Sequence, residues 1–250
     1  MDELGVMEEG GYRFIRAVFQ YSGGVVAQPG FRIERARFRS VLPLAQGFAA
    51  IEQHLRLLGR PMAAFCACEL RSPAPFSEGG FRAFNEAYVE PLKRWGVMRD
   101  GVNPVARTNV CPEVAPPAEP GFYAFSYTMA ADDAEAGGFV VAGSGEAPEG
   151  RGNYRDHAIR LGDRSPQGLR EKARFVLGEM ERRAAALGAG WADATGVHLY
   201  TVYDIHPFMA EELATRGAME KGLSWHFVRP PVADLDYEMD LRGVSREYVF

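Results

Sequence analysis

The sequence has few cysteines, no long hydrophobic run and no excess of positive charge. Only three of its 250 residues are cysteine, and two of these, Cys66 and Cys68, are too close in sequence for an ordinary disulfide framework. No stretch approaches the roughly 18 consecutive apolar residues of a membrane helix. These absences exclude a disulfide scaffold and predict free thiols in a protein that does not span a membrane.

Charge and the first residues indicate the same class of protein. Lys and Arg number 28 against 33 Asp and Glu, a formal net charge of -5, which gives no general attraction to nucleic-acid phosphates. The acidic opening MDELGVMEEGG has neither the basic flank nor the apolar run of a signal peptide. With 47% hydrophobic residues the chain can bury a core. We expect a cytoplasmic protein that binds neither nucleic acid nor membrane.

Motifs for metals and cofactors are also scarce. The five histidines are scattered, and none has a paired metal-ligand spacing such as H-x-x-x-H. The run Gly143-Ser144-Gly145 lacks the third glycine and the following helix of a nucleotide-binding loop. No Gly-x-Ser-x-Gly nucleophile elbow is present. The sequence therefore predicts no metal site and no cofactor.

Two segments, 40–58 and 165–187, have the apolar periodicity of amphipathic helices. Each range begins at a serine that can cap the helix and has a proline in its first turn. Each is followed by a glycine that can end it, Gly59 in the first case and Gly188 in the second. We predict one helix over each range, and the two helices look like copies.

The elements around these helices repeat with an offset of 129 residues, the separation of Gly59 and Gly188. A glycine-marked hairpin precedes each helix, and a strand, a second helical pattern and a further strand follow it. This order predicts two α+β domains, residues 1–130 and 131–250, each a mixed sheet with two helices packed on one face. Because the other face of each sheet also needs cover, we expect an oligomer.

Three short motifs occur in order in the first half: Ser22-Gly23 closing a hairpin, FNEAY at 84–88 and NPVART at 103–108. With the element order, they resemble the Rid (reactive intermediate deaminase, YjgF-like) superfamily. The second half shares the architecture and a strand motif, YEMD at 237–240, but lacks a counterpart of NPVART. The resemblance implies two tandem Rid-like (chorismate-mutase-like) domains, the second diverged, and a homotrimer of six domains with sites in clefts between neighbours.

The resemblance gives Arg107, inside NPVART, the central role. The family's matching arginine grips the carboxylate of an imino or enamino acid, and a planar guanidinium suits this contact because it stays charged and binds a carboxylate with two N–H groups. The last strand departs from the family, since Phe122 stands where a carboxylate that orients water is expected. Glu238 in the second half is the candidate replacement. We expect Arg107 and Glu238 to be catalytic and to meet in a cleft between domains.

The resemblance implies substrate-binding roles at six further positions. In the family, backbone groups at the hairpin and beside the arginine place substrate and water, and an aromatic residue forms a lid. An asparagine on the second helix shares a helical face with Tyr88 and can line the cleft. The residues are Tyr12 for the lid, Ser22 and Gly23 in the hairpin, Asn85 on the helix, and Thr108 and Asn109 after the arginine.

The function implied by these residues is hydrolytic deamination without a cofactor. The substrate would be an imine or enamine of a carboxylic acid, either a 2-iminoacid or a compound of the 2-aminomuconate type, and ammonia would be released. Two alternatives remain open. The missing carboxylate at Phe122 favours a non-catalytic carboxylate-binding sensor. The similarity of chorismatases to Rid domains fused in one chain allows a chorismatase-like hydrolase, although those proteins are longer.

Overall fold

A computed structural model describes residues 4–250 of the chain. Its helices are α1 (Leu44–Leu57), α2 (Glu78–Arg94), α3 (Pro166–Ala186) and α4 (His206–Phe208), which continues as a π-helical turn (Met209–Ala214). The strands are β1 (Leu4–Met7), β2 (Tyr12–Ile15), β3 (Gly24–Ala27), β4 (Phe31–Pro43), β5 (Phe65–Arg71), β6 (Ala106–Pro112), β7 (Gly121–Ala130), β8 (Phe139–Gly145), β9 (Gly196–Tyr200), β10 (Ser224–His226), β11 (Val228–Arg229), β12 (Glu238–Gly243) and β13 (Arg246–Val249).

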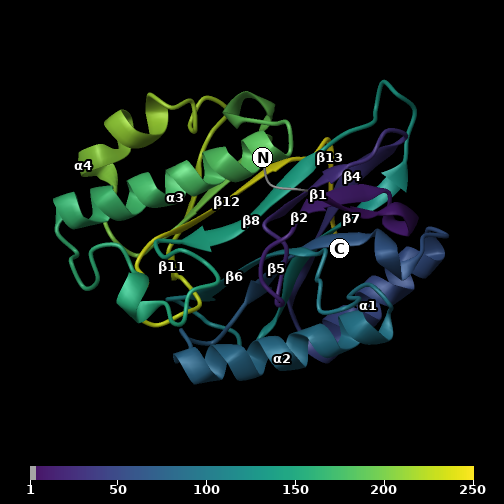
Figure 1. Ribbon diagram of the computed structural model, residues 1–250, viewed down its shortest axis with the longest axis horizontal. Coiled ribbons are helices and arrows are strands. Elements are labelled where there is room, and N and C mark those ends of the chain that lie inside the picture. The colour runs from purple at the N-terminus through teal and green to yellow at the C-terminus, as the bar shows by residue number, and fades with distance from the viewer. Residues whose placement is uncertain (1–3) are drawn as a thin grey trace.

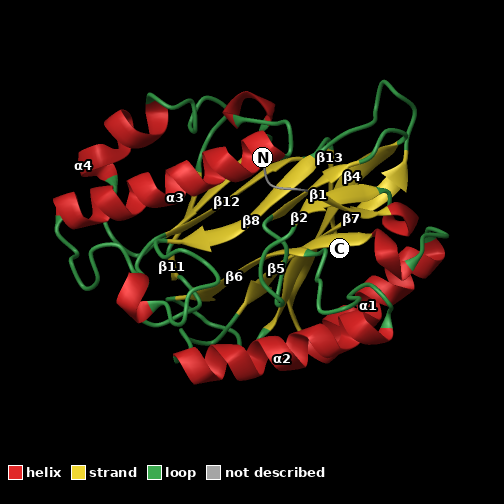
Figure 2. Ribbon diagram, in the orientation of Figure 1, coloured by secondary structure: helices red, strands yellow, loops and turns green. Residues whose placement is uncertain are grey.

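The strands form two mixed sheets between two layers of helices. The first sheet has the order β1-β2-β3-β8-β12-β9-β10, and the second has the order β11-β6-β5-β7-β4-β13. Helices α3 and α4 pack on the outer face of the first sheet, whereas α1 and α2 pack on the outer face of the second (Figures 1 and 2). The layers therefore run helix, sheet, sheet, helix, and each sheet has a helix-covered outer face.

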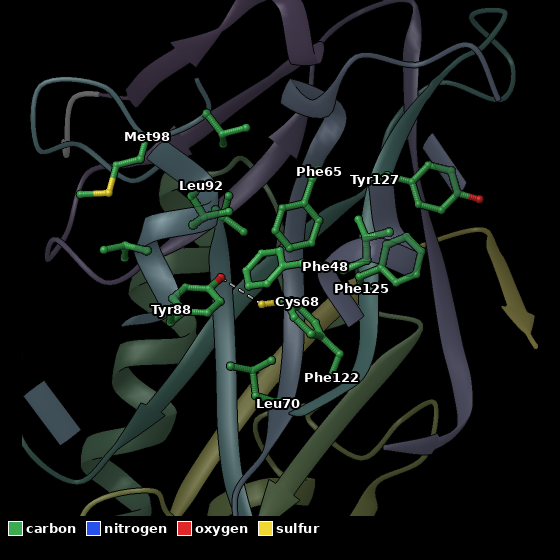
Figure 3. Close-up of a cluster of buried hydrophobic side chains, with 14 of the residues drawn as sticks. Phe48, Phe65, Cys68, Leu70, Tyr88, Leu92, Met98, Phe122, Phe125 and Tyr127 are labelled. Atoms are coloured by element: carbon green, nitrogen blue, oxygen red, sulfur yellow. Dashed lines mark hydrogen bonds between the residues drawn. The ribbon is translucent and has the colours of Figure 1, made fainter. Parts of the chain in front are cut away.

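Aromatic side chains fill the space between the second sheet and its helices (Figure 3). The rings of Phe48 on α1 and Phe122 on β7 meet edge to face with their centroids 4.8 Å apart. The hydroxyl of Tyr88 on α2 lies 3.2 Å from the Sγ of Cys68 on β5. An aromatic pair adds roughly 0.5–1.5 kcal/mol to the free energy gained by burial, so the Phe48–Phe122 pair helps to hold α1 against β7, and the Tyr88–Cys68 contact links α2 to β5.

Both sheets take strands from both halves of the chain, so the expected fold of two tandem Rid-like domains is wrong. In the first sheet Val25 of β3 pairs with Val140 of β8. In the second sheet β13 near the C-terminus runs parallel to β4, with Arg246 opposite Glu34. Backbone hydrogen bonds therefore join the two halves, and the chain is a single domain. The expected boundary after residue 130 falls between β7 and β8, which belong to different sheets.

The inner faces of the two sheets pack against each other. Met7, Tyr12 and Val25 of the first sheet share a buried cluster with Ile33 and Ala67 of the second. The sheet faces that we expected an oligomer to cover are thus already covered within one chain. The homotrimer rested on those open faces and on the Rid resemblance, so the fold gives it no support.

The predicted helices are confirmed in their positions, with one wrong boundary. The side chain of Ser165 accepts an N–H from the first turn of α3, as a cap does. Gly59 and Gly188 follow α1 and α3 with positive φ angles of 65° and 77°. Ser40, however, lies in β4, which continues as far as Pro43 before α1 begins. The apolar spacing could not separate the end of that strand from the start of the helix.

The cysteine prediction is confirmed, since Cys66, Cys68 and Cys111 are buried free thiols. Burial raises the pKa of Cys68 and of Cys111 to about 12, so both stay protonated at neutral pH and are poor nucleophiles. In the described part of the chain, residues 4–250, no helix has the length and apolar character needed to cross a membrane.

Candidate active site

Arg107 is a buried cation with a free hydrogen-bond donor. It lies on β6, beside Cys68 of β5, and points toward α2, whereas its neighbour Thr108 points toward the first sheet. The Arg107 residue is 3% exposed, and its Nη1 has no hydrogen-bond partner. A buried polar group without a partner costs free energy. An anion placed beside Nη1 would recover that cost.

Four aromatic rings surround the guanidinium. The Cζ of Arg107 is 4.7 Å from the ring centroid of Tyr88 and 5.1 Å from that of Tyr21. Phe84 and Phe81 lie at 5.6 and 5.8 Å. Three of these rings share one face of α2, where residues three and four apart are neighbours. Ring faces attract a cation without using its N–H groups, so they hold Arg107 in place and leave Nη1 for a ligand.

A small cavity joins Arg107 to Glu238, the first residue of β12. Its volume is about 30 Å³, which accommodates one or two water molecules. The walls include Tyr21, Arg107, Asn109, Gly143, Tyr154 and Glu238. The structure thus brings together the arginine and the carboxyl group that the sequence marked as candidate catalytic residues. The cavity lies within one chain rather than in a cleft between domains.

The environment of Glu238 favours its neutral form. Glu238 is 4% exposed, and burial, together with the negative charges of Asp240, Glu146 and Glu149, raises its pKa well above the usual value for a carboxyl group. The positive charge of Arg107 opposes this shift and does not cancel it. A carboxyl group that keeps its proton near neutral pH can act as a general acid.

A fully buried charged cluster fixes the backbone just before Glu238. The Nζ of Lys172 on α3 lies 2.6 Å from Asp236 and 3.3 Å from Glu146. The carboxylate of Glu146 also accepts the backbone N–H groups of Asp236, at 2.6 Å, and Tyr237, at 3.0 Å. Because these contacts hold the two residues that precede Glu238, the cluster sets where its carboxyl group lies.

Both asparagines expected to bind substrate line cavities. The Oδ1 of Asn109 accepts the hydroxyl proton of Ser72 at 3.0 Å, and its Nδ2 has no partner. Asn109 therefore presents a free N–H donor in the cavity of Arg107. Asn85 on α2 lines a larger cavity next to the first and is 1% exposed.

The other expected binding residues do not line the cavity of Arg107. Ser22 donates its backbone N–H to Val105, and Gly23 donates to Ile15, so both belong to the backbone around the cavity. Thr108 donates its hydroxyl proton to Asp240 at 2.7 Å. Tyr12 is fully buried between the sheets, where its hydroxyl group donates to the carbonyl oxygen of Phe65 at 3.3 Å.

Sequence reasoning missed Tyr21, Gly143 and Tyr154 as site residues. Tyr21 directly precedes Ser22-Gly23 and lies beside Arg107, whereas Tyr12, the expected lid, is buried between the sheets. The position of Tyr21 next to that motif was the available signal. A Cβ added at Gly143 would lie 2.3 Å from the Oε1 of Glu238, so the absence of a side chain there makes room for the carboxyl group.

A second charged cluster lies between the sheets and outside the cavity. Glu69 forms two contacts with Arg35, at 2.6 and 2.9 Å, and one with Arg242 at 3.0 Å. Arg242 also contacts Asp240 at 3.1 Å. These charges are paired with one another, and we assign the cluster to holding the two sheets together. Within residues 4–250 no group of three or more His, Cys, Asp or Glu side chains could hold a metal ion.

Comparisons with known proteins give a family and a fold neighbour. The sequence profile of the family described as 2-aminomuconate deaminase CnbZ matches residues 4–248. A 2-amino-5-chloromuconate deaminase of Comamonas testosteroni is 52% identical over 250 residues, which cover 100% of both chains. Among solved structures, a crystal structure of a chorismatase matches 89% of this chain and 77% of its own length, with a TM-score of 0.52 and 13% identity.

These matches overturn the Rid resemblance. The motifs that carried it are short, and the fold around them has the two interleaved sheets of one domain rather than two copies of a smaller one. The chorismatase similarity, at 13% identity, describes the fold alone. Arg107 and Glu238 are therefore interpreted from their own geometry and no longer from the Rid pattern.

Proposed function

Because the chain belongs to the family of 2-aminomuconate deaminases CnbZ, we propose that it hydrolyses a 2-aminomuconate to the corresponding 2-oxo dicarboxylate and ammonia. The observation that carries the proposal is the pairing in one buried cavity of Arg107, with an unpartnered N–H, and Glu238, with a raised pKa. The substrate offers a partner to each group. Its carboxylate can accept the free N–H of Arg107, and its adjacent enamine can take the proton of Glu238.

Arg107 binds the carboxylate beside the amino-bearing carbon C2. A guanidinium and a carboxylate form short, charge-assisted hydrogen bonds that are stronger than those between neutral groups. The free Nη1 is one donor for this contact, and the Nδ2 of Asn109 is a second donor in the same cavity. The contact directs C2 and its nitrogen toward Glu238.

Glu238 moves the protons of the reaction. Its carboxyl group donates a proton to C3 of the enamine, which becomes an iminium with a C2=N bond. Water adds to C2 as the Glu238 carboxylate takes its proton, and the same group then protonates the nitrogen. The C2–N bond breaks, ammonia leaves, and the hydroxyl proton of the new carbonyl returns to Glu238. One water is consumed and one ammonia released, with Glu238 again protonated.

The test is ammonia release from 2-aminomuconate generated in the assay by a preceding enzyme. We expect Arg107→Ala to lower kcat/KM by at least about tenfold, because a hydrogen bond to a charged group contributes roughly 1.5–3 kcal/mol. Glu238→Gln, which keeps the shape and loses the acid, should lower kcat by about 100-fold or more.

The matched control is Arg94→Ala, which removes an exposed arginine from the end of α2 away from the cavity. This control should retain the wild-type kcat/KM. Wild-type turnover in a folded Arg107→Ala variant would refute the assignment of Arg107. The absence of ammonia release by the wild-type protein would refute the proposed function itself.

A further inference from the structure

A second, larger cavity adjoins the one that holds Arg107 and Glu238. Its volume is about 430 Å³, against about 30 Å³ for the inner cavity, and it falls in the range of roughly 300–1,000 Å³ that is typical of ligand sites. Phe81 and Tyr154 line both cavities and so form the wall between them. The inner cavity has room for one or two water molecules and is too small for a six-carbon dicarboxylate.

Half of the buried polar side-chain atoms that lack partners in the described chain belong to residues of these two cavities. Within residues 4–250, six buried side-chain nitrogen or oxygen atoms lack a hydrogen bond. Three of the six belong to cavity residues: Nη1 of Arg107 and Nδ2 of Asn109 in the inner cavity, and Oδ1 of Asn85 in the outer one. Buried polar groups are normally paired, so this distribution points to a polar ligand that contacts both cavities.

The outer cavity has groups suited to a carboxylate. The amide of Asn85 can present its NH₂ after a half-turn of the side chain, and Gln20 places a second amide on the wall. Two guanidinium groups also line the cavity, and one of them, Arg82, is already paired with Glu86 at 3.2 Å. The other, Arg151, is the cation best placed to meet an anion.

We propose that the two cavities form one binding site for a linear dicarboxylate, with its amino-bearing end at Arg107 and its far carboxylate at Asn85 and Arg151. The inference rests on the proposed function, because the substrate class supplies two carboxylates at the ends of one chain. The carbon chain passes between Phe81 and Tyr154. Binding therefore requires the Tyr154 ring to move aside, which joins the cavities.

Polar contacts hold the segment that carries Tyr154 in its closed position. The carboxylate of Glu149 accepts the hydroxyl proton of Tyr21 at 2.9 Å and pairs with Arg183 at 2.8 Å. The backbone N–H of Tyr154 donates to the carboxylate of Glu78 on α2. The contact with Glu78 is exposed and can be exchanged for water at a modest net cost. The Tyr154 segment can therefore shift while Glu149 keeps its buried pair with Arg183, and the Tyr154 ring then gives up its edge-to-face contact with Phe81.

The experiment compares 2-aminomuconate with its C6 amide, which has a neutral far end. In Arg151→Ala and in Asn85→Asp, KM for the dicarboxylate should rise about tenfold or more, because each variant removes or opposes a contact to a charged group. For the amide, KM should change less than threefold. Arg94→Ala is the charge-matched control and should leave both KM values unchanged.

An unchanged ratio of the two KM values in both folded variants would overturn the inference. Binding of muconate itself, measured by titration calorimetry, provides a test that needs no turnover. The wild-type protein should bind muconate at least about tenfold more tightly than either variant does. Tight binding of muconate without ammonia release from 2-aminomuconate would reject the proposed function and support the two-cavity site. Ammonia release with equal muconate binding in all variants would support the proposed function and reject the two-cavity site.

Discussion

Replacing Gly143 by alanine gives a sharp test of the role of Glu238. A Cβ at this position would lie 2.3 Å from the Oε1 of Glu238, whereas a carbon and an oxygen normally approach to about 3.3–3.6 Å. The new methyl group would also meet Thr108, at 3.0 Å from its Cγ2 and 3.2 Å from its Cα. Thr108 lies on strand β6, and its backbone is held in place by the sheet. The carboxyl group of Glu238 must therefore move by about 1 Å to reach an ordinary carbon–oxygen distance.

The expected effect on catalysis is much larger than the effect on stability. A misplacement of about 1 Å in a catalytic group can lower the rate about 100-fold, and we expect that loss in kcat. Because Arg107 still binds the carboxylate, KM should stay within about threefold of the wild-type value. Overpacking of a buried site costs roughly 1–3 kcal/mol, which for a domain of this size lowers Tm by about 2–12 °C.

The assay is ammonia release, with thermal unfolding followed on the same preparations. The matched control is Gly178→Ala on α3, where an added Cβ meets no atom within 4 Å. That variant should keep the wild-type kcat and gain up to about 1 kcal/mol in helix stability. If folded Gly143→Ala retained the wild-type kcat, the carboxyl group of Glu238 could not be the proton donor at this position.

Two further predictions concern the buried cluster behind Glu238. The negative charge of Glu146 raises the pKa of Glu238. Glu146→Gln should therefore lower the pKa of Glu238 and move the alkaline limb of the kcat–pH profile to lower pH. An unmoved limb would rule out this electrostatic coupling. Lys172→Met leaves Glu146 buried without its cation and Asp236 with Arg164 alone, at 3.2 Å, and should cost about 3–5 kcal/mol in the free energy of unfolding. A urea titration that shows a loss below 1 kcal/mol would contradict the structural role of Lys172.

Local signals in the sequence predicted local structure well. Capping and glycine positions located the helix of α3 between Ser165 and Gly188, and the same reasoning found the end of α1. The second helical pattern of the second half is broken in the structure, since α4 spans only His206–Phe208 and a π-helical turn follows. In that turn the buried Glu212 pairs with Arg170 of α3 at 2.9 Å, a contact between distant residues that periodicity does not reveal.

The pairing of the strands could not be predicted in the same way. Strands β11 and β13 have two and four residues, too few for a recognisable apolar alternation. They nevertheless join the second half of the chain to the first, opposite Cys111 and Glu34 respectively. The repeat in the order of elements suggested two separate domains because it carries no information on which strands share a sheet.

The candidate site, like the fold, was predictable from the sequence in its individual residues but not in its long-range contacts. Arg107 and Asn109 could be selected from a motif, and Glu238 from the acidic residues of the last strands, but their common cavity depends on the packing of β6 against β8 and β12. The orientation of Asn109 depends on Ser72 of another segment. Tyr21 lies beside Arg107 together with three rings of α2, whereas Tyr12, the expected lid, is buried between the sheets.

The most direct test of the account is a crystal structure of the protein with a 2-oxo dicarboxylate of six carbons bound. We expect one carboxylate within hydrogen-bond distance of the Nη1 of Arg107, the oxo carbon facing Glu238, and the far carboxylate in the outer cavity beyond a displaced Tyr154. A ligand bound elsewhere on the chain, with Nη1 of Arg107 still unpartnered, would contradict it.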